Sequence, residues 1–174
     1  DSVEVGLPRT GWNLIGDPET TKQNPKNYVD GQFSMSFVAA VALREGRMGW
    51  DDYANHLGDD ETLALCRRVR ANVDDRCEAV FPDNMSGVAR VALAGGHSFE
   101  EMVVTPKGEP DNFLSTDEML GKFTTLIAPY LAESQRTLLS DTLLTLNGKT
   151  DAKGLLGLTR PLSGDGFKVA QIAG

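Results

Sequence analysis

The chain has 174 residues, enough for one domain that buries roughly two-thirds of the surface its unfolded form exposes. Its 25 acidic and 17 basic side chains give a net charge of -8, which disfavours a nucleic-acid partner because phosphates would be repelled. The most apolar stretch, within residues 25–43, is too short to cross a bilayer, which needs about 20 apolar residues. We therefore expect neither a nucleic acid nor a membrane as partner.

The chain opens with a predicted strand and a long loop. Apolar residues alternate with small or polar ones over residues 2–7, a period of two that is typical of a strand with one buried face. Residues 9–24 are rich in Gly, Pro, Thr and Asn and predict a loop, and a loop of this length is more often functional than passive. Trp12 in this loop has two possible roles: an anchor on the core, which is the commoner role, or a wall of a ligand pocket.

Residues 30–45 predict one central buried helix. Asp30 is placed to cap its first turn, and Phe37 and Val41 repeat at helical spacing. Further apolar residues widen this stripe until little of the circumference is polar, so we expect the helix inside the domain. Gly46 suits the left-handed conformation that ends helices.

Two short helices and a strand are expected next. The first helix covers residues 50–56, and the second is capped by Asp59 or Asp60 after a break at Gly58. A strand is predicted over residues 69–73. The clearest strand signal follows, because apolar residues lie on both sides of a Gly-Gly pair within residues 86–105. We expect an antiparallel hairpin with a two-residue turn there.

Two further helices complete the predicted fold. Ser115 and Glu118 form a capping box, and the helix that they begin ends before Pro129. The last helix is expected over residues 134–146. The order of elements predicts an α+β fold in which a small antiparallel sheet is covered on one face by helices.

We expect residues 1–148 to form this α+β domain. Residues 149–174 are rich in Gly, Thr and Lys, and we expect them to form a partly flexible tail.

Candidate catalytic and metal-binding residues are few. Cys66 and Cys77 lack the spacing of a zinc knuckle or redox pair, so we expect two buried or half-buried thiols in a reducing, cytoplasmic compartment. His56 and His97 are both expected to face solvent. No metal or organic cofactor is predicted. The sequence shows no signal peptide and no initiator Met, so Asp1 need not be the natural start.

An ordered set of short motifs resembles those of a known family. Residues 30–35 read Asp-Gly-Gln-Phe-Ser-Met before a small-residue apolar helix, and later matches are the Gly-Gly hairpin, Lys107-Gly108-Glu109-Pro110, Leu114-Ser115 and Gly121-Lys122-Phe123. Together these motifs, which cover residues 1–146, resemble the C-terminal α+β domain, or lid, of the MmgE/PrpD family. That family includes 2-methylcitrate dehydratase, cis-aconitate decarboxylase and iminodisuccinate epimerase.

The resemblance implies a lyase or epimerase that acts without a cofactor on a small di- or tricarboxylate. A proton next to a carboxylate is removed, and water or carbon dioxide then leaves or the proton returns on the other face. The family's Asp, His and Lys residues for this chemistry lie mainly in a preceding helical domain. We therefore expect no catalytic residue here, a chain that is inactive without its N-terminal helical domain, and, as relatives suggest, a homodimer.

The resemblance also implies that Trp12, Gln32 and Ser34 face the substrate cleft. The Gln32 amide and the Ser34 hydroxyl can donate to a substrate carboxylate, or they can satisfy first-turn backbone groups instead. Lys22 and Lys26 can add positive potential at the mouth of the cleft, although solvated lysines are the commoner case.

Four positions depart from the family's pattern and leave the substrate open. Phe37 stands where many relatives carry Tyr, and Gly31, Ser36 and Phe113 replace the usual Ala, Pro and Pro.

An alternative is a non-catalytic small-ligand-binding or interaction domain that keeps the lid fold. The codons upstream of Asp1 separate the two hypotheses, since only the enzyme requires a preceding helical domain rich in His and Lys.

Overall fold

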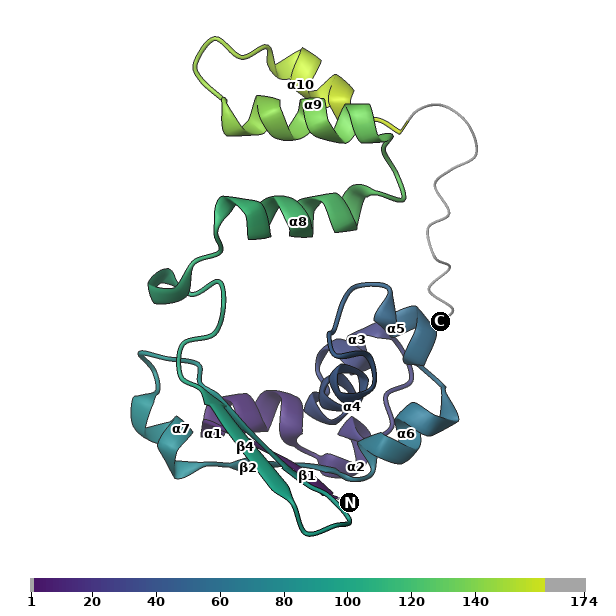
Figure 1. Ribbon diagram of the computed structural model, residues 1–174, viewed down its shortest axis with the longest axis vertical. Coiled ribbons are helices and arrows are strands. Elements are labelled where there is room, and N and C mark those ends of the chain that lie inside the picture. The colour runs from purple at the N-terminus through teal and green to yellow at the C-terminus, as the bar shows by residue number, and fades with distance from the viewer. Residues whose placement is uncertain (1, 162–174) are drawn as a thin grey trace. The chain divides into compact units, whose positions relative to one another are not determined.

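The computed structural model describes residues 2–161 and confirms an α+β fold (Figure 1). The elements in chain order are β1 (Ser2–Leu7), α1 (Arg9–Gly11), the π-helix η1 (Trp12–Gly16), α2 (Glu19–Lys22), α3 (Tyr28–Gln32), α4 (Met35–Glu45), α5 (Asp52–His56), α6 (Asp60–Cys66), β2 (Val69–Val73), α7 (Asp75–Val80), β3 (Gly87–Ala92), β4 (Ser98–Val103), the 3-10 helix η2 (Pro110–Asn112), α8 (Thr116–Ile127), α9 (Glu133–Leu144) and α10 (Ala152–Leu158). None of the helices within residues 2–161 is long and apolar enough to cross a membrane.

Four strands form one sheet in the order β2-β1-β3-β4. The pairs β1–β3 and β3–β4 are antiparallel, as expected, but β1 and β2 run parallel with Val3 opposite Val69. The sheet is therefore mixed rather than purely antiparallel. A parallel pair needs a long crossover connection, and the helices from α1 to α6 provide it.

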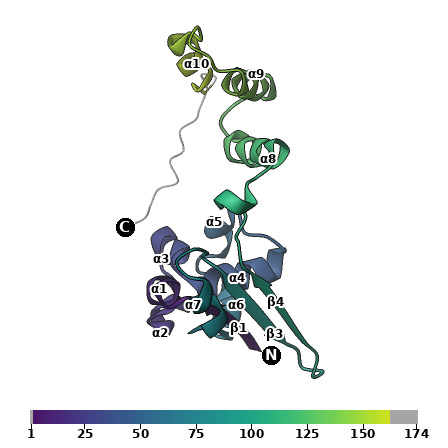
Figure 2. The ribbon, with the colours of Figure 1, turned by 90° about the vertical axis from the view of Figure 1, so that its left-hand side faces the viewer.

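These crossover helices cover one face of the sheet (Figures 1 and 2). The side chains of Val3, Val5, Leu7 and Val69 form a buried cluster on that face, and Trp12, Ile15, Met35, Ala39 and Val91 pack against it. The Trp12 and Ile15 contacts explain why residues 9–24 form short helices rather than the predicted loop. Their turns are too brief to show a helical period in the sequence.

Helix α4 is the central helix of this layer, as the apolar pattern predicted. Met35 and Ala39 contact the sheet cluster, whereas Phe37, Ala40 and Val41 form a second buried cluster with Cys66 of α6. Gly46 ends the helix with φ 70°, the left-handed conformation expected of it.

The predicted helix over residues 30–45 is interrupted before α4 begins. Helix α3 ends at Gln32, and Ser34 has the extended conformation of an N-cap, so its hydroxyl accepts from Phe37 N. Asp30 was expected to cap this helix and does not. A serine side chain that caps a new turn competes with helix continuation, and here the cap wins.

The elements that follow β2 in the first unit agree only in part with those predicted from the sequence. The β3–β4 hairpin is confirmed, but its turn spans residues 93–97, with Leu93 N donating to His97 O at 2.8 Å. Helix α7 was not predicted; Asp74 caps it by accepting from Arg76 N, and Cys77 Sγ lies 3.6 Å from Gly6 O.

Contacts divide the chain into a first unit that ends at Phe113 and a second that begins at Leu114. In the second unit, the predicted capping box is present, because Ser115 Oγ accepts from Glu118 N and Glu118 Oε2 accepts from Ser115 N at 2.7 Å. The segment expected to fray contains α10, which Asp151 caps. Residues 162–174 of the predicted tail lie outside the described residues.

Candidate functional site

The three predicted substrate-binding residues lie on different elements. Trp12 begins η1, Gln32 ends α3, and Ser34 caps α4. They differ in whether their polar groups are exposed to a ligand or are already hydrogen-bonded within the protein.

The Trp12 side chain is committed to the core. Its Nε1 donates to Ala71 O at 3.1 Å, and its ring packs on the buried sheet cluster. A Cβ atom at Gly16 would lie 2.7 Å from Trp12 Cδ1, so the π-helix closes tightly around the ring. This geometry is that of an anchor, and a contact of Trp12 with substrate stays a prediction.

The Ser34 side chain is 1% exposed and fully hydrogen-bonded. Its Oγ donates to Lys22 O and accepts from Phe37 N at 3.0 Å. The hydroxyl therefore ties the junction of α3 and α4 to the end of α2. Direct binding of substrate by Ser34 stays a prediction that would require these bonds to open.

Gln32 is exposed at the end of α3. Val29 lies three residues before it on α3 and Phe33 directly follows it, and these two side chains are 61% and 43% exposed. The exposed Gln32 side chain presents an amide with two N–H donors and one acceptor at the surface. Trp12 and Ser34 use their polar groups in hydrogen bonds within the protein. Gln32 is the predicted residue whose polar side chain is exposed.

Helix α3 is fixed at its beginning by a reciprocal cap. Asn27 Oδ1 accepts from Asp30 N at 3.0 Å, while Asp30 Oδ2 accepts from Asn27 Nδ2 at 3.2 Å and from Lys26 N at 3.0 Å. The spacing of Asn27 and Asp30 is that of an N-cap and its third residue, a signal that the sequence carried. Together with the Ser34 bonds, this cap holds a short helix at both ends.

The two lysines considered for the mouth of a cleft bind local oxygen atoms. Lys22 Nζ donates to Leu14 O at 2.8 Å, and Lys26 Nζ donates to Asn24 Oδ1 at 2.9 Å. Their charges lie in the segment that leads into α3, so they contribute positive potential near it.

Beneath α3 lies an aromatic cluster formed by Tyr28, Phe37, Trp50 and Tyr53. Tyr53 is its centre, with ring centroids 5.9 Å from Tyr28, 6.0 Å from Phe37 and 6.1 Å from Trp50. Burial raises the pKa of the Tyr53 phenol. No periodic pattern in the sequence groups these four residues, because they come from two helices, a loop and a third helix.

His56 is buried, and the expectation that it faces solvent was wrong. Its Nδ1 lies 2.9 Å from Thr62 Oγ1 and its Nε2 lies 3.4 Å from Glu45 Oε1. Arg44 donates to Asp59 and to Thr62 in the same cluster, which joins the end of α4 to α5 and α6. His97 is exposed, as expected.

The pKa of Asp59 is lowered to about 2. The main cause is the backbone N–H of Thr62, helped by the Thr62 hydroxyl and by Arg44. Thr62 is fully buried, so its hydroxyl serves the contact between helices and not a ligand.

Both thiols are free and buried, as predicted. Burial raises the pKa of Cys66 to about 11, so this thiol stays protonated and unreactive at neutral pH. Among residues 2–161, no three His, Cys, Asp or Glu side chains come together as metal ligands.

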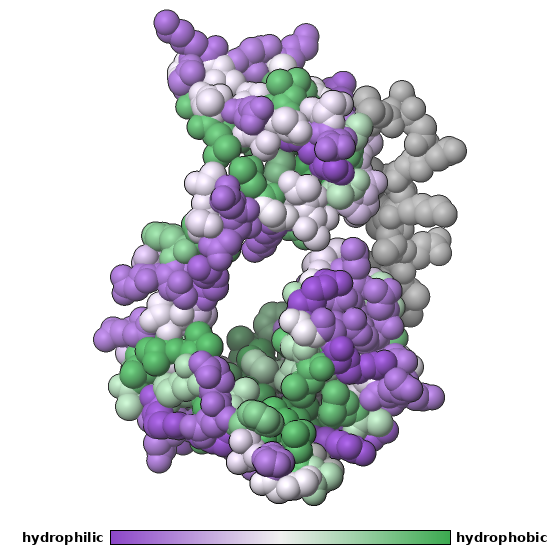
Figure 3. Space-filling view, in the orientation of Figure 1, coloured by the Kyte–Doolittle hydropathy of each residue, from purple (hydrophilic) through white to green (hydrophobic). Residues whose placement is uncertain are grey.

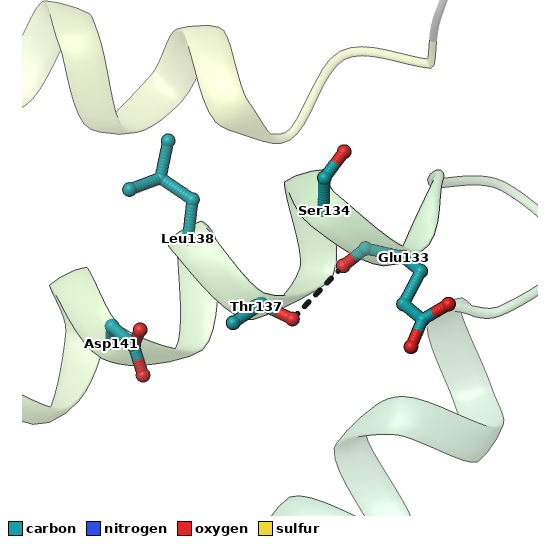
Figure 4. Close-up of a pocket in the computed structure, with 5 residues that line it drawn as sticks. All are labelled: Glu133, Ser134, Thr137, Leu138 and Asp141. Atoms are coloured by element: carbon teal, nitrogen blue, oxygen red, sulfur yellow. Dashed lines mark hydrogen bonds between the residues drawn. The ribbon is translucent and has the colours of Figure 1, made fainter.

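An open concavity on the second unit lies along α9 (Figure 4). Its lining residues are Glu133, Ser134, Thr137, Leu138 and Asp141. The Thr137 hydroxyl donates to Glu133 O at 3.1 Å, so it is occupied by its own helix. Two carboxylates and no cation line this concavity, a charge that opposes an anionic ligand. The surface around Gln32 is therefore the better candidate for a carboxylate.

Comparison with known proteins identifies one family. Residues 1–146 match the family model described as the MmgE/PrpD C-terminal domain. This range covers the whole first unit and the second unit up to Leu146, just past the end of α9. No curated protein matches the chain.

Proposed function

Because the chain belongs to the MmgE/PrpD family, we propose that it forms one wall of an active site for a small di- or tricarboxylate. The family is generally enzymatic. The proposed reaction is a lyase or epimerase step, in which a proton next to a carboxylate is removed before water or carbon dioxide leaves or the proton returns. A helical domain that precedes this one supplies the base and the acid.

In this proposal, Gln32 is the residue that contacts substrate. Its side-chain N–H donates to a substrate carboxylate, an interaction with a charged acceptor that is worth more than a neutral hydrogen bond. The observation that carries this step is the exposure of Gln32 at the end of a helix fixed by Asn27, Asp30 and Ser34. Ser34 and Trp12 then act by holding the surrounding segments in place.

Exposed apolar side chains beside Gln32 support a partner domain at this surface. Val29, Phe33 and Trp50 are all more than two-fifths exposed, and apolar side chains reach the surface of both units (Figure 3). The Trp50 ring lies 6.1 Å from the ring of Tyr28 on α3, so these side chains come from neighbouring segments, and exposed apolar side chains that gather in this way are typical of a surface that packs against another protein layer. We propose that the N-terminal helical domain covers this surface and encloses the substrate.

The test uses the protein joined to its N-terminal helical domain. Turnover of 2-methylcitrate, cis-aconitate and iminodisuccinate is measured first, and the active substrate is then used with Gln32→Ala. We expect KM to rise or kcat to fall by at least about tenfold, the loss of one charge-assisted hydrogen bond. Gln23→Ala is the matched control. The Gln23 amide is part-buried and donates to Val69 O, so it is not presented at the surface of α3 as the Gln32 amide is.

Two results would contradict the proposal. Unchanged kinetics of Gln32→Ala would remove this residue from the site while leaving the enzyme class intact. If none of these three polycarboxylates is turned over, the result would instead favour the alternative of a non-catalytic binding domain.

A further inference from the structure

We infer that Tyr53 is a positioning residue for Gln32: its ring, packed against Phe37, supports α3 at Gly31 and so sets where the Gln32 amide lies. This inference rests on the proposed function, since it concerns the same contact with substrate. It adds a residue on another helix, 21 positions along the chain, that acts through the contact of its ring with α3.

Close approach at Gly31 is the first observation. Gly31 is buried, and a Cβ atom placed on it would lie 3.1 Å from Tyr53 Cδ1 and 3.4 Å from Phe37 Cδ1. The backbone of α3 therefore lies directly on these two rings. Phe37 is fully buried, so it cannot move aside for a larger residue without disturbing a packed core.

Contact at two points of α3 is the second observation. The Tyr53 ring touches the region of Gly31 and also pairs with the Tyr28 ring, one turn earlier in the same helix. Two contacts on one helix restrict both its height above the rings and its rotation. Tyr53 also pairs with Trp50 and Phe37, which holds the Tyr53 ring itself in place.

Gln32 follows Gly31 directly, so any displacement of Gly31 is passed to it across one peptide unit of about 3.8 Å. The caps at Asn27 and Ser34 hold the two ends of α3, and neither of these hydrogen bonds involves Gly31, so the rings of Tyr53 and Phe37 are what the helix rests on between its ends. A misplacement of about 1 Å is enough to weaken a directed hydrogen bond, and the cost is at most that of losing the Gln32 contact, about tenfold.

The first experiment uses the chain alone and needs no substrate. Tyr53→Leu removes the ring, whereas Tyr53→Phe keeps it. In NMR spectra, Tyr53→Leu is expected to shift the backbone amides of residues 28–33 and the Gln32 side-chain amide, and Tyr53→Phe is expected to leave them nearly unchanged. Equal and small shifts in both variants would overturn the inference. A Tyr53→Leu chain too unstable to study is replaced by Gly31→Ala, which pushes α3 away from an intact ring.

The second experiment is a double-mutant cycle in the protein joined to its N-terminal domain. If Tyr53 acts through Gln32, Tyr53→Leu raises KM by up to the tenfold expected of Gln32→Ala, and the double variant is no worse than Gln32→Ala within about twofold. Tyr53→Phe retains the parent KM. Independent effects that multiply in the double variant would overturn the positioning role and leave the Gln32 contact standing. A Gln32→Ala variant with parent kinetics would overturn the contact itself, and with it this inference.

Discussion

Gln32 and Ser34 lie two residues apart and meet opposite environments. The chain leaves α3 at Gln32 and turns inward, so the Gln32 side chain remains at the surface while the Ser34 hydroxyl is enclosed between Lys22 O and Phe37 N. An enclosed hydroxyl with both bonds made contributes to stability, because breaking them leaves buried backbone groups without partners. Two residues of one short segment therefore have different roles: Ser34 stabilises the fold, and Gln32 is the candidate for contact with substrate.

Ser34→Ala should destabilise the first unit by about 1–2 kcal/mol, the usual cost of a lost N-cap with a buried unsatisfied group. Urea denaturation followed by tryptophan fluorescence measures this change. Ser98→Ala is the control, because Ser98 is exposed on β4 of the same unit and its replacement should change stability by less than about 0.5 kcal/mol. A loss for Ser34→Ala no larger than this control would show that the cap and the tether are dispensable.

At the scale of elements, an ion network joins the sheet to α7. Asp74 accepts from Arg90 on β3 and from Arg76 on α7, and Glu100 on β4 accepts from both arginines. These hydrogen bonds, with Arg90 first for Asp74 and Arg76 first for Glu100, hold the pKa of both carboxylates below the usual range. The network connects α7 and β3 to the edge strand β4, whose Phe99 and Val103 side chains are exposed.

The lowered pKa of Asp74 predicts acid sensitivity. A carboxylate with a folded pKa below its unfolded value of about 3.9 stabilises the fold fully above that value, and the contribution is lost as the pH falls toward the folded value. The stability of Asp74→Asn should therefore be lower at neutral pH and fall less steeply between about pH 5 and pH 2. Asp83→Asn, at an exposed aspartate, serves as the control in denaturation curves at several pH values. Parallel curves for the parent and Asp74→Asn would contradict the prediction.

On the largest scale, contacts group the chain into two units, and each has buried residues or hydrogen bonds of its own among residues 2–161. Both buried clusters of the first unit, around β1 and around Phe37, lie before Phe113. The second unit has its own contacts, such as Gln135 Nε2 on α9, which donates to Leu158 O on α10 at 2.7 Å. Each unit therefore has the internal contacts on which cooperative folding depends.

A fragment of residues 1–113 is expected to fold by itself. It contains the complete sheet, and it contains both tryptophans of the sequence, Trp12 and Trp50. Tryptophan fluorescence thus reports on the first unit in the fragment and in the whole chain alike. We expect cooperative urea transitions with similar midpoints in both, whereas a fragment with no cooperative transition would show that the first unit needs residues beyond Phe113.

Elements whose signals are local could be predicted from the sequence alone. The alternation around Val3 and Val5 gave β1, the Ser115–Glu118 pair gave the capping box, and Gly46 gave the end of the central helix. Ordered motifs also indicated the family that the comparison identified over residues 1–146. These features need only the chemistry of neighbouring residues, which is why they can be recognised without a structure.

Contacts between residues far apart in the chain could be seen only in the folded protein. The parallel pairing of β1 with β2, the burial of His56 between Glu45 and Thr62, and the packing of Gly31 on Tyr53 each join segments separated by other elements. No local pattern encodes such contacts, because the free energy that selects them comes from burying surfaces that meet only in the folded chain. For the same reason, the sequence could name Gln32 and Ser34 as a pair, but only the fold could show that one is exposed and the other enclosed.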